Sequence, residues 1–166
     1  MASMTLNPPP QAGTAGHWQH LPASGTNQPV PGDGQLSDRD YRALARFRHA
    51  LRVFQRFSEQ AAREAGITPA QHQLMLAVRG FPGDTPPTTS DLAEMLQQRN
   101  HSVVELIDRA ETAGLLSRRV DEDDARKRLI EHTPLAREIL AQLSAVHRTE
   151  LRRFRNEMED ILGELG

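Results

Sequence analysis

The chain has 166 residues, a formal net charge of −2 and an aromatic content of 4%, which suits one domain with its own core and excludes an aromatic platform for single-stranded nucleic acid. The absence of cysteine excludes disulfides, thiolate zinc sites and cysteine nucleophiles. The sequence shows no signal-peptide pattern and no run approaching the roughly 18 apolar residues of a membrane span, so we expect a cytoplasmic protein that does not engage a membrane.

Residues 1–35 combine proline, glycine, serine and threonine with almost no charge and no apolar period. Such a composition cannot bury enough apolar surface to offset the entropy lost on ordering. We therefore predict a disordered tail over residues 1–35 and one folded domain over residues 36–166. Trp18, inside this tail, is either a passive residue or a contact for a partner.

An amphipathic helix is predicted over residues 37–65, because apolar side chains recur there at spacings of three and four. These side chains are Leu44, Phe47, Leu51 and Phe54. Thr68-Pro69 followed by Gln71 forms a capping box, which predicts the start of a second helix. That helix ends near Gly80, and a loop rich in proline and glycine follows.

The next segment has the outline of a helix-turn-helix. Thr88 and Asp91 form a second cap-like pair for a short helix that ends at about Leu96. After a polar break at residues 97–100, a further helix carries one apolar face and ends at Gly114. That face consists of Val103, Leu106, Ile107 and Ala110. Two helices joined by a tight polar turn are typical of a helix-turn-helix.

Residues 118–130, RRVDEDDARKRLI, place acidic side chains between two basic clusters. Short apolar segments flank this stretch, so we interpret it as a β-hairpin whose tip, residues 121–124, uses aspartates to form the turn. Arg126 would then lie on the returning strand, oriented by the tip carboxylates. A solvated charged loop is the alternative. A helix-turn-helix followed by a charged hairpin is a winged helix, so the predicted fold class is mainly α with a small β-hairpin wing.

Thr133-Pro134 predicts the start of a last helix whose apolar stripe runs almost to the C-terminus. The stripe comprises Leu135, Ile139, Leu143, Val146, Leu151, Phe154, Met158, Ile161, Leu162 and Leu165. One winged helix cannot cover both this stripe and that of the first helix, whereas a second copy of the chain can. We therefore expect a homodimer with dimerisation helices at about residues 37–65 and 134–165.

Four motifs occur in order: Ile67-Thr68-Pro69-Ala70-Gln71; Asp91-Leu92-Ala93-x-x-Leu96; Ser102-Val103-Val104-x-Leu106-Ile107-Asp108-Arg109-Ala110-Glu111-x-x-Gly114-Leu115; and Asp121-x-x-Asp124-x-Arg126 followed by Thr133-Pro134. In this order and spacing they resemble the MarR family, the multiple-antibiotic-resistance type of bacterial transcription regulators. The resemblance implies a homodimer with interleaved terminal helices, a winged helix at about residues 67–132 and an effector crevice that commonly takes small aromatic or phenolic acids. His132 stands where the family usually has leucine, and Leu135-Ala136 where it often has Lys-Gly. These departures leave the register of the second wing strand open.

The start of the recognition helix holds the first group of candidate DNA contacts, because helix-turn-helix proteins place their base contacts there. The residues outside its apolar face are Arg99, Asn100, His101, Ser102, Val104 and Glu105. Arg99 suits guanine, Asn100 adenine and Glu105 cytosine, whereas Val104 suits a thymine methyl group. Ser102 suits a phosphate. Asn100 and Ser102 are also good helix caps, which is the structural alternative for both.

The wing holds the second group of candidate contacts. Arg126 matches the family's wing arginine and suits the narrow minor groove of A·T-rich DNA. The other basic residues there, Arg118, Arg119, Lys127 and Arg128, are candidates for phosphate contacts or ordinary surface charges. For Asp108 we favour a salt bridge, with a wing arginine as its candidate partner.

The predicted function is a dimeric, ligand-responsive transcription regulator, most often a repressor, that binds a pseudo-palindromic site on double-stranded DNA. The alternative is a helical protein-interaction module whose winged helix no longer binds DNA, because residues 86–133 hold ten acidic and seven basic side chains. No catalytic or metal motif is present, so we expect no enzyme, no metal site and no cofactor. The effector residues stay unknown; the candidate anion anchors near the expected crevice are Arg46, His49, Arg52 and His72.

Overall fold

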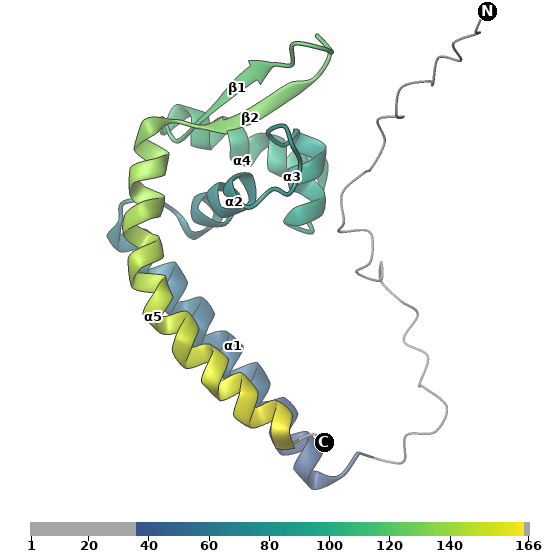
Figure 1. Ribbon diagram of the computed structural model, residues 1–166, viewed down its shortest axis with the longest axis vertical. Coiled ribbons are helices and arrows are strands. Elements are labelled where there is room, and N and C mark those ends of the chain that lie inside the picture. Colours follow the sequence, from purple (N-terminus) through teal and green to yellow (C-terminus); the bar gives the residue numbers. More distant parts are fainter. Residues whose placement is uncertain (1–35, 165–166) are drawn as a thin grey trace, which may run out of the picture.

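A computed structural model describes residues 36–164 (Figure 1). The predicted tail with Trp18, and the stripe residue Leu165, lie outside these described residues. The elements, in chain order, are α1 Asp38–Glu64, α2 Pro69–Arg79, α3 Thr89–Met95, α4 Asn100–Thr112, β1 Leu116–Val120, β2 Arg128–His132 and α5 Pro134–Glu164. The predicted fold class, mainly helical with a small hairpin, is confirmed.

Capping boxes fix the starts of three helices. The hydroxyl of Ser37 accepts a hydrogen bond from the backbone N–H of Asp40, and the Asp40 carboxylate accepts one from the Ser37 backbone. Thr68 with Gln71, and Thr88 with Asp91, repeat this arrangement at α2 and α3. Because each box satisfies N–H groups that the helix itself leaves without partners, the short sequence patterns determine where these helices begin.

The core of the winged helix lies where α2, α3 and α4 meet the base of the wing. Val103, Leu106, Ile107 and Ala110 of α4 are all buried, as their periodicity predicts. Leu74 and Met75 of α2 complete this core, and neither has any exposed side-chain surface. The buried face of α4 is therefore the packing face, and the opposite face remains for other contacts.

The wing is an antiparallel pair of strands in which Leu116 pairs with His132 and Val120 with Arg128. The pairing register of the second wing strand, which the sequence left open, is therefore regular up to His132. The ring of His132 is half-buried, and its Nε2 lies 2.9 Å from the carbonyl oxygen of Met75. His132 therefore replaces an apolar contact with a hydrogen bond to α2, and the strand keeps its register.

Figure 1 shows α1 and α5 side by side as a long two-helix arm that extends away from the winged helix. The predicted stripe of α5 divides into two faces in the single chain. Leu143 and Ile161 are buried, whereas Val146, Leu151 and Leu162 are about half exposed, at 53%, 49% and 59%. Among the described residues, no helix combines the length and the apolar character needed to cross a bilayer.

Candidate nucleic-acid interface

The first part of the candidate interface is the exposed N-terminal half of α4. Arg99, Asn100, His101, Val104 and Glu105 are exposed there, and Ser102 is half-buried. Val104 keeps 40% of its surface exposed, although Val103 beside it is fully buried. This half of the helix therefore presents polar and apolar side chains of the kinds that read base edges.

The cap of α4 differs from the predicted alternatives. Arg99 is the N-cap residue, and it makes no side-chain capping bond. Asn100 lies inside the helix and donates from Nδ2 to the hydroxyl oxygen of Ser90 over 3.3 Å, so it connects α4 to α3. Neither Asn100 nor Ser102 is the cap, because the N-cap residue is Arg99, one residue before Asn100 and three residues before Ser102. The backbone N–H groups at this end of α4 remain available to an anion.

The second part is the wing tip, where aspartates shape the loop as predicted. One carboxylate oxygen of Asp121 accepts hydrogen bonds from the backbone N–H groups of Asp123 and Asp124, at 2.8 and 3.0 Å. These two bonds are the main reason that the pKa of Asp121 lies below its usual value. Asp124 in turn accepts from the backbone N–H of Arg126 over 3.0 Å. The acidic cluster therefore organises backbone at the tip.

The predicted placement of Arg126 on the returning strand is wrong. The strand begins at Arg128, and Arg126 lies in the preceding loop, which extends over residues 121–127. The Asp124 carboxylate orients only the backbone of Arg126, and the Arg126 guanidinium makes no ion pair within residues 36–164. Lys127 is likewise exposed in this loop without an ion pair to any described residue. The loop is longer than the four-residue tip because Asp121 and Lys127 close it through a backbone bond of 3.2 Å.

Arg118 connects the wing to the recognition helix. Its guanidinium forms ion pairs with Asp108, at 2.6 Å, and with Glu111, both on α4. The prediction that Asp108 pairs with a wing arginine is thus confirmed. Since Arg118 is already engaged by two carboxylates, its placement favours a role in positioning the wing over a phosphate contact.

The two remaining wing arginines also have partners. Arg119 pairs with Glu131 across the hairpin at 2.9 Å and with Glu122 at 3.6 Å, and Glu131 is the main reason that the pKa of Arg119 is raised. Arg128 donates to the carbonyl oxygen of Ala125 over 2.7 Å and makes no ion pair with a carboxylate of the described residues. Within residues 36–164, the exposed positive charges at the wing tip that have no carboxylate partner are therefore Arg126, Lys127 and Arg128.

The effector candidates do not form one cluster. Arg46, His49 and Arg52 lie exposed on α1, whereas His72 on α2 is only 2% exposed. Burial, and then the charge of nearby His147, lowers the pKa of His72 to about 4. His72 is therefore neutral at pH 7, and a neutral imidazole is a poor anchor for an anion.

Sequence reasoning missed the group around His72. The rings of His72 and His147 have their centres 5.1 Å apart where α2 meets α5. The Nδ1 of His147 lies 2.8 Å from the carbonyl oxygen of Leu143 and donates to it, and Nε2 lies 3.0 Å from the hydroxyl oxygen of Ser58. These residues lie on three helices and form no local motif. Among the described residues, no group of three or more potential ligands could hold a metal ion.

The short α3, the turn, the recognition helix α4 and the wing define a winged helix-turn-helix protein. The MarR family model matches residues 65–127, which cover α2 through the wing loop. AbsC of Streptomyces coelicolor, a MarR family transcriptional regulator, is similar with 24% identity and a TM-score of 0.64, over 80% of this chain and 90% of that one. The MepR–DNA complex of Staphylococcus aureus is similar with 20% identity and a TM-score of 0.60, over 79% and 95%. A transcriptional regulator of Thermotoga maritima is similar with 24% identity and a TM-score of 0.51, over 76% and 82%.

No curated protein matches the chain in sequence. At the identities above, the solved structures establish the fold, and the family model supplies the sequence match. The family predicted from the motifs is confirmed over residues 65–127, which match its model, and the described fold is that of MarR-family regulators.

Proposed function

We propose that the protein is a homodimeric transcription regulator that binds double-stranded DNA through α4 and the wing, acts as a repressor and responds to a small ligand. The observation that carries this proposal is the double ion pair of Arg118 with Asp108 and Glu111. It holds the wing in a fixed relation to α4, so the base-reading end of the helix and the loop arginine at the wing tip can engage one duplex together. The DNA complex of the similar MepR structure supports this use of the fold.

Each element has a distinct task in this proposal. Arg99 and Asn100 enter the major groove with Val104 and Glu105, since these side chains are exposed at the start of the recognition helix. Ser102 and His101 lie beside them near the phosphates. Arg126 enters the adjacent minor groove, where a cation is attracted by the strong negative potential.

The remaining basic wing residues supply positive charge near the phosphate backbone. These residues are Lys127 and Arg128, because Arg118 and Arg119 are already paired with carboxylates. Phosphate contacts position a protein on DNA without reading sequence. We therefore assign selectivity to α4 and Arg126, and non-specific affinity to the other wing charges.

Dimerisation through α1 and α5 is supported by apolar side chains that the single chain leaves exposed. Tyr41 and Val53 on α1 are 59% and 46% exposed, and Val146 and Leu151 on α5 are 53% and 49% exposed. Large apolar residues grouped on an arm are typical of an interface between chains. A two-fold dimer would present two winged helices to half-sites about one helical turn apart, on a pseudo-palindromic operator.

A ligand would act by shifting the population between dimers with DNA-compatible and DNA-incompatible spacings of the two winged helices. The family resemblance suggests a small aromatic or phenolic acid as this ligand. Arg46, His49 and Arg52 remain the candidate anion anchors on the arm, because they are exposed on α1.

Footprinting on the duplex upstream of its own gene tests the regulator against a helical interaction module that does not bind DNA. We expect a protected pseudo-palindromic site at low salt, and sedimentation should give a dimer at micromolar concentration. Arg126→Ala should weaken binding by about tenfold or more and reduce the slope of log K against log salt by about 1, with the dimer intact. Arg63→Ala is the matched control, since Arg63 is an exposed arginine paired with Glu59 on α1. The proposal would be contradicted if the protein had no preferred duplex site, or if the Arg126→Ala variant bound that site as tightly as the wild type.

A further inference from the structure

The loop at the wing tip holds Arg126 by its backbone. The peptide group that joins Ala125 to Arg126 has a partner at each of its polar atoms. Its N–H donates to the Asp124 carboxylate over 3.0 Å, and its carbonyl oxygen accepts from Nη1 of Arg128 over 2.7 Å. Because both partners are side chains of the wing itself, this peptide group has a fixed orientation before any DNA is bound.

Arg128 also bonds to the backbone on the other side of Arg126. Its Nη1 donates to the carbonyl oxygen of Lys127 over 3.3 Å, and that oxygen also accepts from the backbone N–H of Asp121 over 3.2 Å. One nitrogen of the Arg128 guanidinium therefore joins the carbonyl before Arg126 to the carbonyl after it. Arginine suits this task because each Nη atom carries two N–H groups, and a charged donor forms stronger hydrogen bonds than a neutral one.

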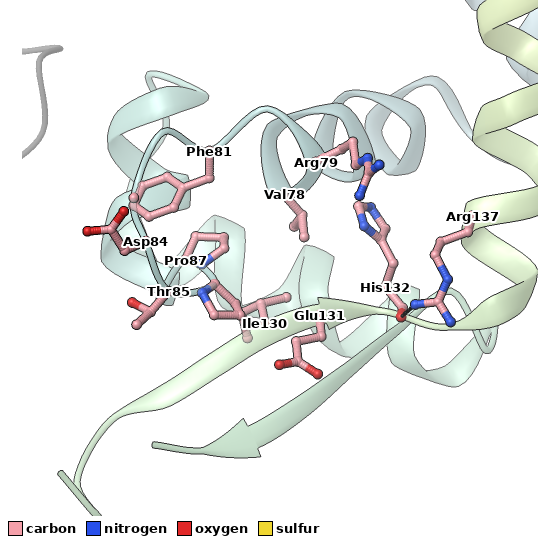
Figure 2. A pocket seen from close by; sticks show the side chains of 12 residues that line it. Val78, Arg79, Phe81, Asp84, Thr85, Pro87, Ile130, Glu131, His132 and Arg137 are labelled. Carbon is pink, nitrogen blue, oxygen red and sulfur yellow. Dashed lines mark hydrogen bonds between the residues drawn. The ribbon is translucent and has the colours of Figure 1, made fainter. Parts of the chain in front are cut away.

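The strand gives the Arg128 side chain a fixed base. Arg128 is the first residue of β2 and pairs with Val120 of β1. The next two residues, Leu129 and Ile130, are buried. The N–H of Ile130 donates to the carbonyl oxygen of Pro87 over 2.8 Å, and Figure 2 shows these two residues side by side at the root of the wing. The guanidinium thus reaches back over the loop from a strand that the core holds in place.

The side chain of Arg126 is left for a partner outside the chain. Arg126 is exposed, and within residues 36–164 its side chain makes no hydrogen bond or ion pair. A loop that must become ordered on binding weakens affinity, whereas a loop that is already ordered avoids this cost. With its backbone fixed, only the side chain of Arg126 has to become ordered on DNA.

Lys127 provides the contrast to Arg128. It is also exposed, and its side chain makes no hydrogen bond or ion pair to a described residue. Lys127 therefore supplies positive charge alone, whereas Arg128 supplies the same charge together with two bonds to the backbone around Arg126.

We propose that Arg128 is a positioning residue for Arg126: it fixes the backbone on both sides of Arg126 and so directs the Arg126 guanidinium into the minor groove. This inference rests on the proposed function, in which Arg126 reads that groove, and it gives Arg128 a task beyond its charge. Phosphate contacts carry no sequence information, whereas a residue that positions Arg126 contributes to the preference for A·T pairs. The two roles can therefore be separated by measurement.

Backbone amide NMR relaxation of the full chain without DNA tests the structural step. We expect order parameters of about 0.85 at residues 125–127 in the wild type and below about 0.6 in Arg128→Met. Lys127→Met is the matched control, because it removes the neighbouring charge but no bond, and its loop should stay rigid. If methionine disturbs the hairpin, Arg128→Thr replaces it, since threonine suits a strand and also lacks the guanidinium. A loop that stays rigid without the Arg128 guanidinium would overturn the inference.

The second test compares two duplexes that carry the footprinted site and differ only beside each half-site, where one has A·T pairs and the other G·C pairs. We expect the wild type to prefer the A·T duplex by about tenfold or more. Arg128→Met should reduce this preference by about three- to tenfold, the loss expected when a bound segment has to be ordered first. Lys127→Met should weaken binding to both duplexes equally. In the Arg126→Ala background, Arg128→Met should not change the preference any further.

The inference and the proposed function fail in different ways. The inference is overturned if Arg128→Met lowers the affinity for both duplexes equally, as Lys127→Met does, or if it changes the preference even without Arg126. In both cases Arg126→Ala can still abolish the preference, which leaves the proposed function intact. If Arg126→Ala keeps the wild-type preference, the proposed reading of the minor groove fails together with the inference.

Discussion

Replacing Arg118 with methionine should detach the wing from the recognition helix. Methionine keeps an unbranched apolar stem but removes the charge that Asp108 and Glu111 share. The side chains of Arg118 and Glu111 are each 28% exposed, whereas Asp108 is 58% exposed, so the pair with Glu111 is the better shielded. Exposed ion pairs contribute about 0.2–1 kcal/mol each, and partial burial places this one at the upper end. We therefore expect the free energy of unfolding to fall by about 1–2 kcal/mol.

Arg119 is the matched comparison, since it is the next residue and also forms two ion pairs. Its own side chain is 43% exposed, and its partners Glu131 and Glu122 are 35% and 91% exposed. Solvent screens these pairs more strongly, so Arg119→Met should lower the free energy of unfolding by less than Arg118→Met does. Both variants would be measured by urea unfolding at one fixed protomer concentration, because the proposed dimerisation would contribute to the apparent stability.

A double-mutant cycle of Arg118→Met with Glu111→Gln isolates the pair and should give a coupling energy of about 0.5–1.5 kcal/mol. DNA affinity should also fall in Arg118→Met, by more than in Arg119→Met, because the wing loses its attachment to α4. A coupling energy near zero, or equal effects of the two substitutions on DNA affinity, would refute the idea that Arg118 fixes the wing to the recognition helix.

Two further substitutions test separate features of the fold. Folding lowers the pKa of His72 from 6.5 to about 4, so the unfolded chain binds more protons between these values and stability must fall as the pH drops through this window, by up to about 3 kcal/mol. His72→Leu should flatten this fall in pH-dependent urea unfolding, and an unchanged pH profile would refute the assignment. Gln97, in the turn before α4, has a φ of 52°, which is costly for a residue with a Cβ atom. Gln97→Gly should therefore stabilise the protein by up to about 1 kcal/mol despite losing the bond of its side chain to the Glu94 carbonyl, and thermal unfolding that shows a loss would contradict this reasoning.

The elements of the fold could be predicted because their signals are local. Thr68 and Thr88 each carry their capping partner three residues later, and the periodicity of α4 separates buried Val103 from exposed Val104. Such patterns depend on backbone geometry within one or two turns, which the sequence displays directly. The length of the wing loop was harder to predict, because the backbone bond between Asp121 and Lys127 closes a longer loop than the four-residue tip.

The parts of the site that could not be predicted arise from residues far apart in the chain. Ser58 and His147 form a hydrogen bond across 89 positions, and the rings of His72 and His147 lie 5.1 Å apart because α2 packs against α5. Neither pair has a characteristic spacing. The pairing of Asp108 with a wing arginine was predictable because α4 leads into β1 within a few residues, and the second partner, Glu111, lies three residues further along the same helix.

The apolar side chains of α5 cover more of the helix surface than the contact with α1 alone requires. Ala136, Leu140 and Leu143 are buried in the single chain, whereas Val146 and Leu151 are about half exposed. A stripe that served only the contact with α1 would place all its large side chains on one face of the helix. The exposed residues widen the apolar surface around α5, and each lies a few positions from a buried one. In the proposed dimer the same helix would therefore contact α1 of its own chain and a second chain at once, and it would transmit a change in the arm to the spacing of the two winged helices.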